Sequence, residues 1–374
     1  MAIFDDARNL VCELVAIESV NPDLVPGGSG ETGIARFVAG WLEAAGAEVE
    51  IVETVEGRPS VAGVVRGSGG GGSLMLNAHM DTVGAGGMIR PFEPVVSDGR
   101  VYGRGSYDMK GSLAAIMLAA REARRLRLKG DLIVTAVADE EVASLGTSAI
   151  LDRFRADAAI VTEPTELRLC LAHKGFVWLE VETTGVAAHG SRADLGVDAI
   201  AAMGPILSGI AGLARRLAEG PAHPLLGHPS IHASLVEGGQ EMSTYPARCV
   251  ARLERRTVPG EGTALVTRQV ESLSESGAAA VRVLLERQPS DVSRDLPVAR
   301  SVSEAAGNPE VIGVPYWMDM ALLNSAGIPC VAYGPAGEGE HADVEWVDIA
   351  SIERCVEVYL GAAERLTRST RAGF

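Results

Sequence analysis

The spacing of apolar residues changes twice along this chain, and that change constrains the fold more than any other feature. Over residues 5–18 and 31–46, apolar residues recur at helical spacing. Further on, predicted strands are interleaved with one predicted helix; the strands are 48–54, 60–66, 73–79, 131–138, 157–161 and 168–172, and the helix is 109–127. Strands that alternate with helices predict an α/β fold, in which a mixed, mostly parallel sheet is flanked by helices on both faces.

The segment 176–288 has a different order of elements: strand, helix, strand, strand, helix, strand. The predicted strands are 176–184, 230–237, 248–256 and 280–287, and the predicted helices are 197–218 and 262–276. Pro205 is out of place in the first of these helices and predicts a kink or a later helix start. The βαββαβ order is that of a ferredoxin-like module, which is long enough here to fold by itself.

The first pattern returns near residue 297, with a predicted helix at 297–307, a strand at 328–333 and a helix at 348–367. We therefore predict an α/β domain made of residues 1–175 and 289–374. An inserted ferredoxin-like domain, residues 176–288, interrupts it.

A glycine run, GSGGGG at 67–72, lies between two predicted strands. A phosphate-binding loop would need a following GK[ST] sequence and a helix, and neither is present. We therefore predict a flexible hairpin turn.

The composition excludes several classes of partner. Acidic residues outnumber basic ones by 49 to 33, a formal charge of −16, which repels nucleic acid. The start, MAIFDDARNL, does not resemble a signal peptide, and no apolar run reaches the ~18–20 residues that span a bilayer. Five scattered cysteines without a CxxC pair argue against a disulfide framework or a thiolate zinc site. We expect a cytoplasmic protein without nucleic-acid or membrane partners.

Two motifs with acidic side chains follow predicted elements of the first domain. In His79-Met-Asp81, residues two apart in an extended segment point to the same side, so Asp81 can orient His79 as a metal ligand. A polar turn explains the same motif equally well. In GRGSYDMKG, residues 103–111, Asp108 lies where a loop meets a helix, either as a ligand or as a helix cap.

Three further motifs complete the set. Asp139-Glu140-Glu141 directly follows an apolar strand, where adjacent carboxylates need a cation or a raised pKa unless the loop is simply solvated. Glu163 follows the next strand, and His341 lies near the C-terminus. Imidazoles and carboxylates without cysteine suit zinc, cobalt or manganese in a hydrolytic centre.

In this order, HMD, GRGSYDMKG, DEE, TEP and the late histidine resemble one family of metallopeptidases with two co-catalytic metal ions. The family includes acetylornithine deacetylase, succinyl-diaminopimelate desuccinylase, aminoacylase and glutamate carboxypeptidase. The resemblance runs from residue 1 to about 367 and includes the inserted domain. It implies two divalent metal ions, a lid role for the inserted domain, and a homodimer formed through that domain.

The resemblance also implies a role for each motif residue. Asp108 would bridge the two metals, His79 and Glu163 would complete one ligand set, and Glu141 and His341 the other. Asp81 would orient His79. Glu140 would be the general base, because a water held by two metals ~3.5–4 Å apart needs a nearby carboxylate to take its proton.

Two candidates lie in the inserted domain. The resemblance makes His189 a donor to the developing oxyanion, reaching the neighbouring subunit's site, and Arg256 the group that grips a substrate carboxylate. A surface histidine and a solvent-facing arginine are the alternatives. Two positions depart from the family: Ser243 replaces a frequent asparagine, and Met318 precedes Asp319 where a small or hydroxyl residue is common.

The sequence therefore predicts a metal-dependent amidohydrolase that removes an acyl group from an N-acyl amino acid or a related small amide. The alternative with the same chemistry is a dipeptidase or glutamate-carboxypeptidase-type exopeptidase. A non-catalytic binding protein is the rival from another class, and Glu140 beside Glu141 argues against it, since a binder needs no base.

Overall fold

The computed structural model describes residues 2–274 and 279–368, and its contacts divide the chain into two compact units. Unit 1 comprises Met1–Leu171, Val292–Ile312 and Met318–Phe374, and unit 2 comprises Ala172–Asp291 and Gly313–Trp317. The boundaries expected from the sequence, 176 and 288, fall inside unit 2. Among the described residues, no helix is both long and apolar enough to cross a membrane.

The centre of unit 1 is a mixed sheet with four parallel strands. In sheet order these are β6 (Leu132–Val137), β3 (Leu74–His79), β7 (Ala158–Val161) and β15 (Cys330–Ala332). Every residue of these strands is buried, which is why they are mostly apolar and do not alternate between apolar and polar residues. The sheet continues antiparallel on both sides, through β2 (Ser60–Val65) and β1 (Glu48–Val52), and through β8 (Leu169–His173).

The glycine run does not form a hairpin, so that prediction is wrong. β2 and β3 are not paired, because β6 lies between them in the sheet. The run instead crosses the chain that leads into β6: Ser68 N–H donates to Leu128 O and Gly69 N–H to Lys129 O, both at 2.8 Å. A Cβ on Gly71 would lie 1.9 Å from Thr367 O, so this crossing requires glycine.

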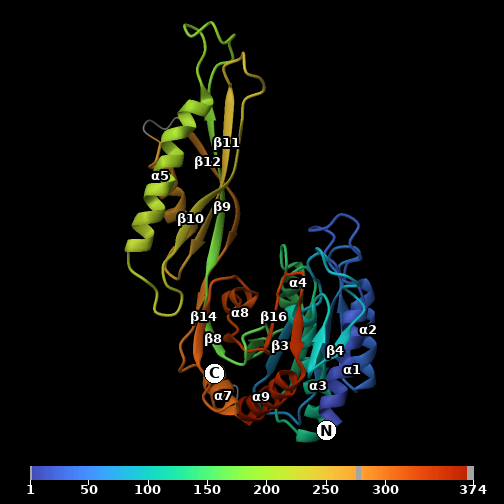
Figure 1. Ribbon diagram of the computed structural model, residues 1–374. Helices are drawn as coiled ribbons and strands as arrows, with labels where there is room; N and C mark the ends of the chain where they lie inside the picture. Colours follow the sequence, from blue (N-terminus) through green and yellow to red (C-terminus); the bar gives the residue numbers. More distant parts are fainter. Residues whose placement is uncertain (1, 275–278, 369–374) are drawn as a thin grey trace. The chain divides into compact units, whose positions relative to one another are not determined.

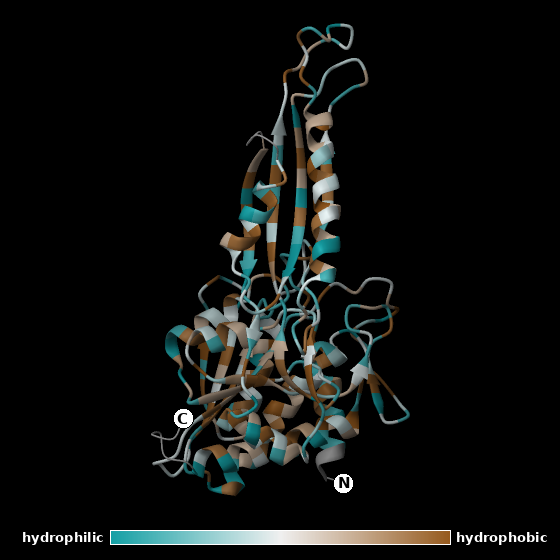
Figure 2. Cartoon of the chain, turned by 90° about the vertical axis from the view of Figure 1, so that its left-hand side faces the viewer, coloured by the Kyte–Doolittle hydropathy of each residue, from teal (hydrophilic) through white to brown (hydrophobic). Residues whose placement is uncertain are grey.

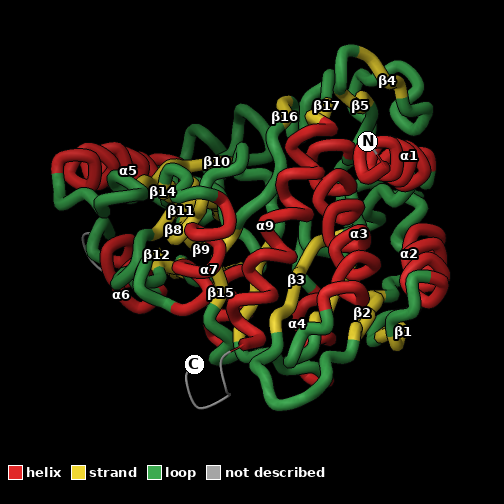
Figure 3. Tube along the Cα trace, turned by 90° about the horizontal axis from the view of Figure 1, so that it is seen from below, coloured by secondary structure: helices red, strands yellow, loops and turns green. Residues whose placement is uncertain are grey.

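Two groups of helices cover the sheet. The first group is α1 (Ala2–Ala16), α2 (Thr32–Ala44), α3 (Gly111–Leu126), α7 (Pro297–Ala306) and α9 (Ile349–Arg368), and the second is α4 (Leu145–Arg153) and α8 (Met320–Ser325). Members of each group contact one another, and β2 and β6 contact both groups, so the groups cover opposite faces (Figure 3).

A small antiparallel sheet joins two distant segments of unit 1. Its strands are β4 (Val95–Ser97), β5 (Arg100–Tyr102), β17 (Trp346–Asp348) and β16 (Gly337–Glu338). The turn η1 (Ser106–Lys110), in which Asp108 and Met109 have non-helical backbone angles, follows β5 and leads into α3. This sheet brings the loop that carries Asp108 next to the segment that carries His341.

Unit 2 has the predicted βαββαβ order, and its strands pair in the order expected of a ferredoxin-like sheet (Figure 1). The elements are β9 (Gly175–Thr184), α5 (Ala199–Glu219), β10 (Ser230–Gly238), β11 (Arg248–Thr257), α6 (Thr263–Glu271) and β12 (Ala279–Arg287). Apolar residues of β9 and β11 pack with α5 and α6 in one core, and the long strands alternate in hydropathy (Figure 2). Two short strands, β13 (Ser290–Asp291) and β14 (Val311–Val314), lie where the chain leaves and re-enters unit 2.

Two details of the helices in unit 2 differ from the expectation. Helix α5 passes through Pro205 and starts at Ala199, because the side chain of Asp198 caps it by accepting from Ala201 N–H at 2.9 Å. Helix α6 ends at Glu271 rather than at 276, and the last two residues of the predicted helix lie outside the described residues.

Candidate metal centre

The ends of three neighbouring parallel strands bring the predicted acidic motifs together. His79 ends β3, the Asp139–Glu141 turn follows β6, and Glu163 follows β7. Because parallel neighbours end at the same edge of a sheet, these side chains converge there. His79 Nε2 lies 3.9 Å from a carboxylate oxygen of Glu163.

Asp108 lies between the two predicted histidine ligands. Its Oδ1 is 3.0 Å from Nε2 of His79, and its Oδ2 is 3.3 Å from Nε2 of His341. The same His341 nitrogen lies 3.2 Å from Glu141 Oε2. Each oxygen of Asp108 therefore faces a different imidazole, with Glu163 beside the first and Glu141 beside the second.

These side chains fit divalent metal ions. Two groups of potential ligand atoms lie within 4.8 Å of one another: His79 with Glu140 and Glu163, and His79 with Asp108 and Glu141. Neither group contains a cysteine, and an oxygen and nitrogen donor set suits zinc, cobalt or manganese. The residues of these two groups, all predicted from the sequence, lie together in unit 1.

The electrostatics of the cluster also favour a bound cation. Burial, together with the charge of Glu163, raises the pKa of Glu140 well above its usual value, and burial raises the pKa of Glu163 to about 8. Hydrogen bonds to Asp108 and Glu141 raise the pKa of His341 to about 10. Burial alone would lower the pKa of His79, but Asp108 and Glu163 raise it well above its usual value. The carboxylates of the cluster thus exceed in charge the two imidazoles of His79 and His341.

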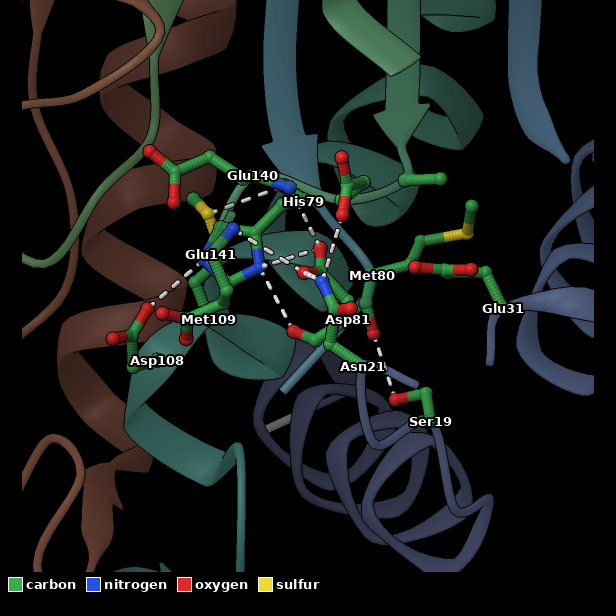
Figure 4. A network of polar contacts seen from close by, with 12 residues as sticks. Ser19, Asn21, Glu31, His79, Met80, Asp81, Asp108, Met109, Glu140 and Glu141 are labelled. Carbon is green, nitrogen blue, oxygen red and sulfur yellow. Dashed lines mark hydrogen bonds and ion pairs between the residues drawn. The ribbon is translucent and has the colours of Figure 1, made fainter. Parts of the chain in front are cut away.

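Asp81 contacts His79 mainly through its main chain. Nδ1 of His79 is 2.9 Å from Asp81 O and 3.6 Å from the carboxylate. The carboxylate instead accepts from the backbone N–H groups of Glu140 at 3.1 Å and Glu141 at 3.3 Å (Figure 4). Asp81 therefore fixes both the imidazole of His79 and the Asp139–Glu141 turn.

Glu345, which no sequence motif singled out, holds the loop that presents Asp108. Its buried carboxylate accepts from the N–H groups of Gly105 and Tyr107 at 2.9 Å and of Asp108 at 3.0 Å, and from Arg104 Nη1 at 2.7 Å. Arg104 Nη2 also donates to Ala342 O, beside His341. The sequence signal that could have identified Glu345 is an acidic residue between apolar residues, in VEWV.

Asp108 does not cap a helix, because α3 begins at Gly111 with Lys110 as its N-cap residue. Asp319 is buried, and its carboxylate accepts a hydrogen bond from Thr147 Oγ1, so this side chain is held within the core.

The two other predicted site residues, His189 and Arg256, belong to unit 2. His189 is exposed, and its Nδ1 lies 2.9 Å from Ser191 Oγ; the next residue, Gly190, donates to the carbonyl oxygen of Ser243. On β11, Arg256 forms an ion pair with Glu254 at 2.7 Å and lies over the ring of Phe176. Their roles towards the metal centre stay predictions.

Comparisons with known proteins identify the family and the fold. An acetylornithine deacetylase of Myxococcus xanthus is 30% identical, over 94% of this chain and 95% of that protein. Among solved structures, a tripeptidase of Staphylococcus aureus has a TM-score of 0.80 at 20% identity, covering 98% of this chain and 99% of its own. A dinuclear metal-binding peptidase of Bacillus subtilis has a TM-score of 0.73 at 18% identity, covering 98% of both chains. The pattern of peptidase family M20/M25/M40 matches residues 75–365, so the chain belongs to this family of amide-bond hydrolases.

Proposed function

We propose that this enzyme removes the acyl group from an N-acyl amino acid at a centre of two divalent metal ions. The observation that carries the chemistry is Asp108, whose two oxygens each face a different histidine. Similarity to acetylornithine deacetylases over nearly the whole chain supports the substrate class.

We assign Asp108 as the ligand shared by both metals. His79 and Glu163 complete one set, and Glu141 and His341 the other, as their distances support. Zinc is the ion we assign, with cobalt or manganese as alternatives. Bound there, two such ions would polarise the scissile carbonyl and lower the pKa of a water molecule.

Glu140 is the group we assign as general base. Its carboxylate lies among the potential ligand atoms with His79 and Glu163, close enough to take a proton from water and pass it to the leaving amine. Asp81 accepts from the backbone N–H groups on both sides of the Glu140 Cα and keeps the base in place. We assign His189 as the donor to the oxyanion.

A dipeptidase or exopeptidase would use the same metal centre. We keep this alternative because the tripeptidase of Staphylococcus aureus has the same fold. The two are separated by parallel assays of the zinc- and cobalt-loaded enzyme on N-acetyl and N-succinyl amino acids and on dipeptides. We expect kcat/KM to be at least about tenfold higher on the best acyl amino acid, a difference of 1.4 kcal/mol in transition-state binding. A preference for dipeptides would replace deacylation by peptide cleavage.

Arg256 is the residue we assign to the substrate carboxylate. Replacing it by Met removes a bidentate donor, so we expect KM to rise about tenfold or more with a smaller change in kcat. Arg252→Met is the matched control, because Arg252 lies on the same strand and forms an ion pair with Glu180. Equal KM values in both variants would contradict the assignment.

Glu345→Gln tests the loop that carries Asp108. The amide turns one acceptor oxygen into a donor that faces the backbone N–H groups of residues 105–108, so we expect zinc affinity and kcat to fall about 10–100-fold. Asp343→Asn, in the same segment and bound to the N–H of Gly87, should stay near wild type. Unchanged zinc affinity of Glu345→Gln would contradict this support role.

We propose a cytoplasmic homodimer that pairs through the inserted domain. β10 is an edge strand of unit 2, and its Leu235 and Val236 are 53% and 57% exposed. Exposed aliphatic residues on a sheet edge favour pairing with another strand. Light scattering should give about twice the chain mass of 39.0 kDa, and a monomer mass would reject the dimer.

A further inference from the structure

A buried polar network of Asn21, Glu31 and Arg58 contacts the Asp139–Glu141 turn, and the proposed chemistry assigns no role to these three residues. Arg58 donates from Nε to Glu31 Oε2 at 2.7 Å and from Nη2 to Glu31 Oε1 at 2.9 Å. The same Nη2 donates to Asp139 Oδ1 at 2.8 Å. One guanidinium group thus joins α2's N-cap residue to the first residue of the turn.

Asn21 connects this ion pair to Asp81. Its Nδ2 donates to Asp81 Oδ2 at 2.8 Å (Figure 4). The same nitrogen donates to Asp139 Oδ1 at 3.0 Å. The main chain of Asn21 is fixed as well, because its N–H donates to Thr82 O at 2.9 Å. The amide group therefore ties together the two carboxylates that hold the turn.

Asp139 has a backbone conformation that needs such support. Its φ of +66° lies in the left-handed region, which non-glycine residues rarely adopt. Its carbonyl oxygen accepts from the N–H groups of Ala143 and Ser144, and its side chain accepts from Asn21 and Arg58. These contacts fix the direction in which Glu140 and Glu141 leave the strand.

The burial of the network argues against a role in stability alone. Asp81, Asp139 and Glu31 are fully buried, and Arg58 is 7% exposed. Arg58 pairs with the buried carboxylates of Glu31 and Asp139 and with the exposed carboxylate of Asp23, and replacing such buried ion pairs by apolar side chains of similar volume often costs no stability.

We propose that Asn21 and Arg58 are positioning residues, which act through Asp81 and Asp139 to hold the general base Glu140 and the metal ligand Glu141. This inference rests on the proposed function for the roles of Glu140 and Glu141. It extends the functional set to two residues outside the metal motifs. Asn21 acts through Asp81 and Asp139, and Arg58 acts through Asp139.

Asn21→Ala is the first test, since it breaks the link between Asp81 and Asp139 without adding a charge. We expect kcat to fall about 10²-fold with KM within about threefold, because a small displacement of the base affects the transition state most. Zinc affinity, measured by competition with a chromogenic chelator, should fall about 10–100-fold. The matched control is Asn324→Ala, whose side chain bonds both backbone polar groups of Cys330.

Arg58→Lys and Arg58→Met form the second test. Lysine keeps the buried positive charge but lacks the planar guanidinium group. We therefore expect Arg58→Lys to have a higher melting temperature than Arg58→Met, while its kcat and zinc affinity stay low. Arg66→Met is the control, because Arg66 also binds two carboxylates, Glu48 and Asp131, at the other end of β2. It should match the wild type in kcat and zinc affinity.

The inference is overturned if folded Asn21→Ala and Arg58→Lys keep kcat and zinc affinity within about threefold of their controls. If Asn21→Ala does not fold, Arg58→Lys decides alone. Zinc affinity is measured without substrate, so a wild-type enzyme that hydrolyses no acyl amino acid would reject the proposed function and leave this comparison intact.

Discussion

Replacing Glu140 by Gln is expected to lower kcat by about 10²–10⁴-fold, the usual contribution of a general base. Glutamine has nearly the same shape, but its amide cannot take a proton from water at neutral pH. The backbone N–H of residue 140 still donates to Asp81, so the turn should keep its conformation. The variant should therefore bind metal as the wild type does while losing its turnover.

The measurement compares kcat, KM and metal content of Glu140→Gln with those of Glu141→Gln. Glu141 faces His341 at 3.2 Å and is assigned as a ligand, so its variant should lose metal as well as activity. The contrast separates a base from a ligand one residue away. A Glu140→Gln enzyme that retains more than about a tenth of kcat, or loses a metal ion, would contradict the assignment.

The part of the site formed by strand ends could be predicted from the sequence. The mostly apolar sequences of β3, β6 and β7 indicate buried parallel strands, and polar residues at the ends of such strands converge at one edge of the sheet. His79, the Asp139–Glu141 turn and Glu163 follow this rule. Local sequence was sufficient because each side chain is placed by the strand that precedes it.

Asp108 and His341 could be placed only through the family resemblance. Their segments meet because β5 pairs with β17, and these strands have three residues each, too few for a readable alternation. Glu345 belongs to the His341 segment and binds the Asp108 loop, from which it is separated by more than 235 positions. Contacts of that range leave no local pattern in the chain.

Helix α4 and the glycine run show two other limits of the sequence. Helix α4 was not predicted, since its nine residues include Gly146 and two hydroxyl residues and have low helix propensity. The glycine run suggested a hairpin because β2 and β3 are consecutive, although β6, from later in the chain, lies between them. Sequence adjacency cannot reveal a strand inserted by a later segment.

Asn21 and Arg58 carried no signal, because isolated polar residues near proline usually lie in exposed loops. Their burial becomes visible only once α2, β2 and the Asp139 turn are packed together. Positioning residues of this kind are the part of a site that sequence motifs omit, since Asp139 lies 118 positions from Asn21 and 81 positions from Arg58.

Removing metal is expected to abolish activity, and zinc or cobalt should restore it. Without cations, the carboxylates around Asp108 take up protons or pair with protonated imidazoles. The proposed base then has no metal-activated water to deprotonate. Dialysis against a chelator, followed by titration with zinc while activity and metal per chain are recorded, measures this. Full activity of metal-free protein would reject the proposed chemistry.

The stoichiometry of single variants tests the shared ligand most directly. His341→Ala should keep one ion per chain and Glu163→Ala the other, because the two residues lie on opposite sides of Asp108. Asp108→Ala should weaken both sites, since each of its oxygens faces a different histidine. His232→Ala, a histidine of unit 2 paired with Glu254, should keep two ions. If Asp108→Ala lost only one ion, Asp108 would belong to a single site, and one carboxylate could not coordinate both metals during hydrolysis.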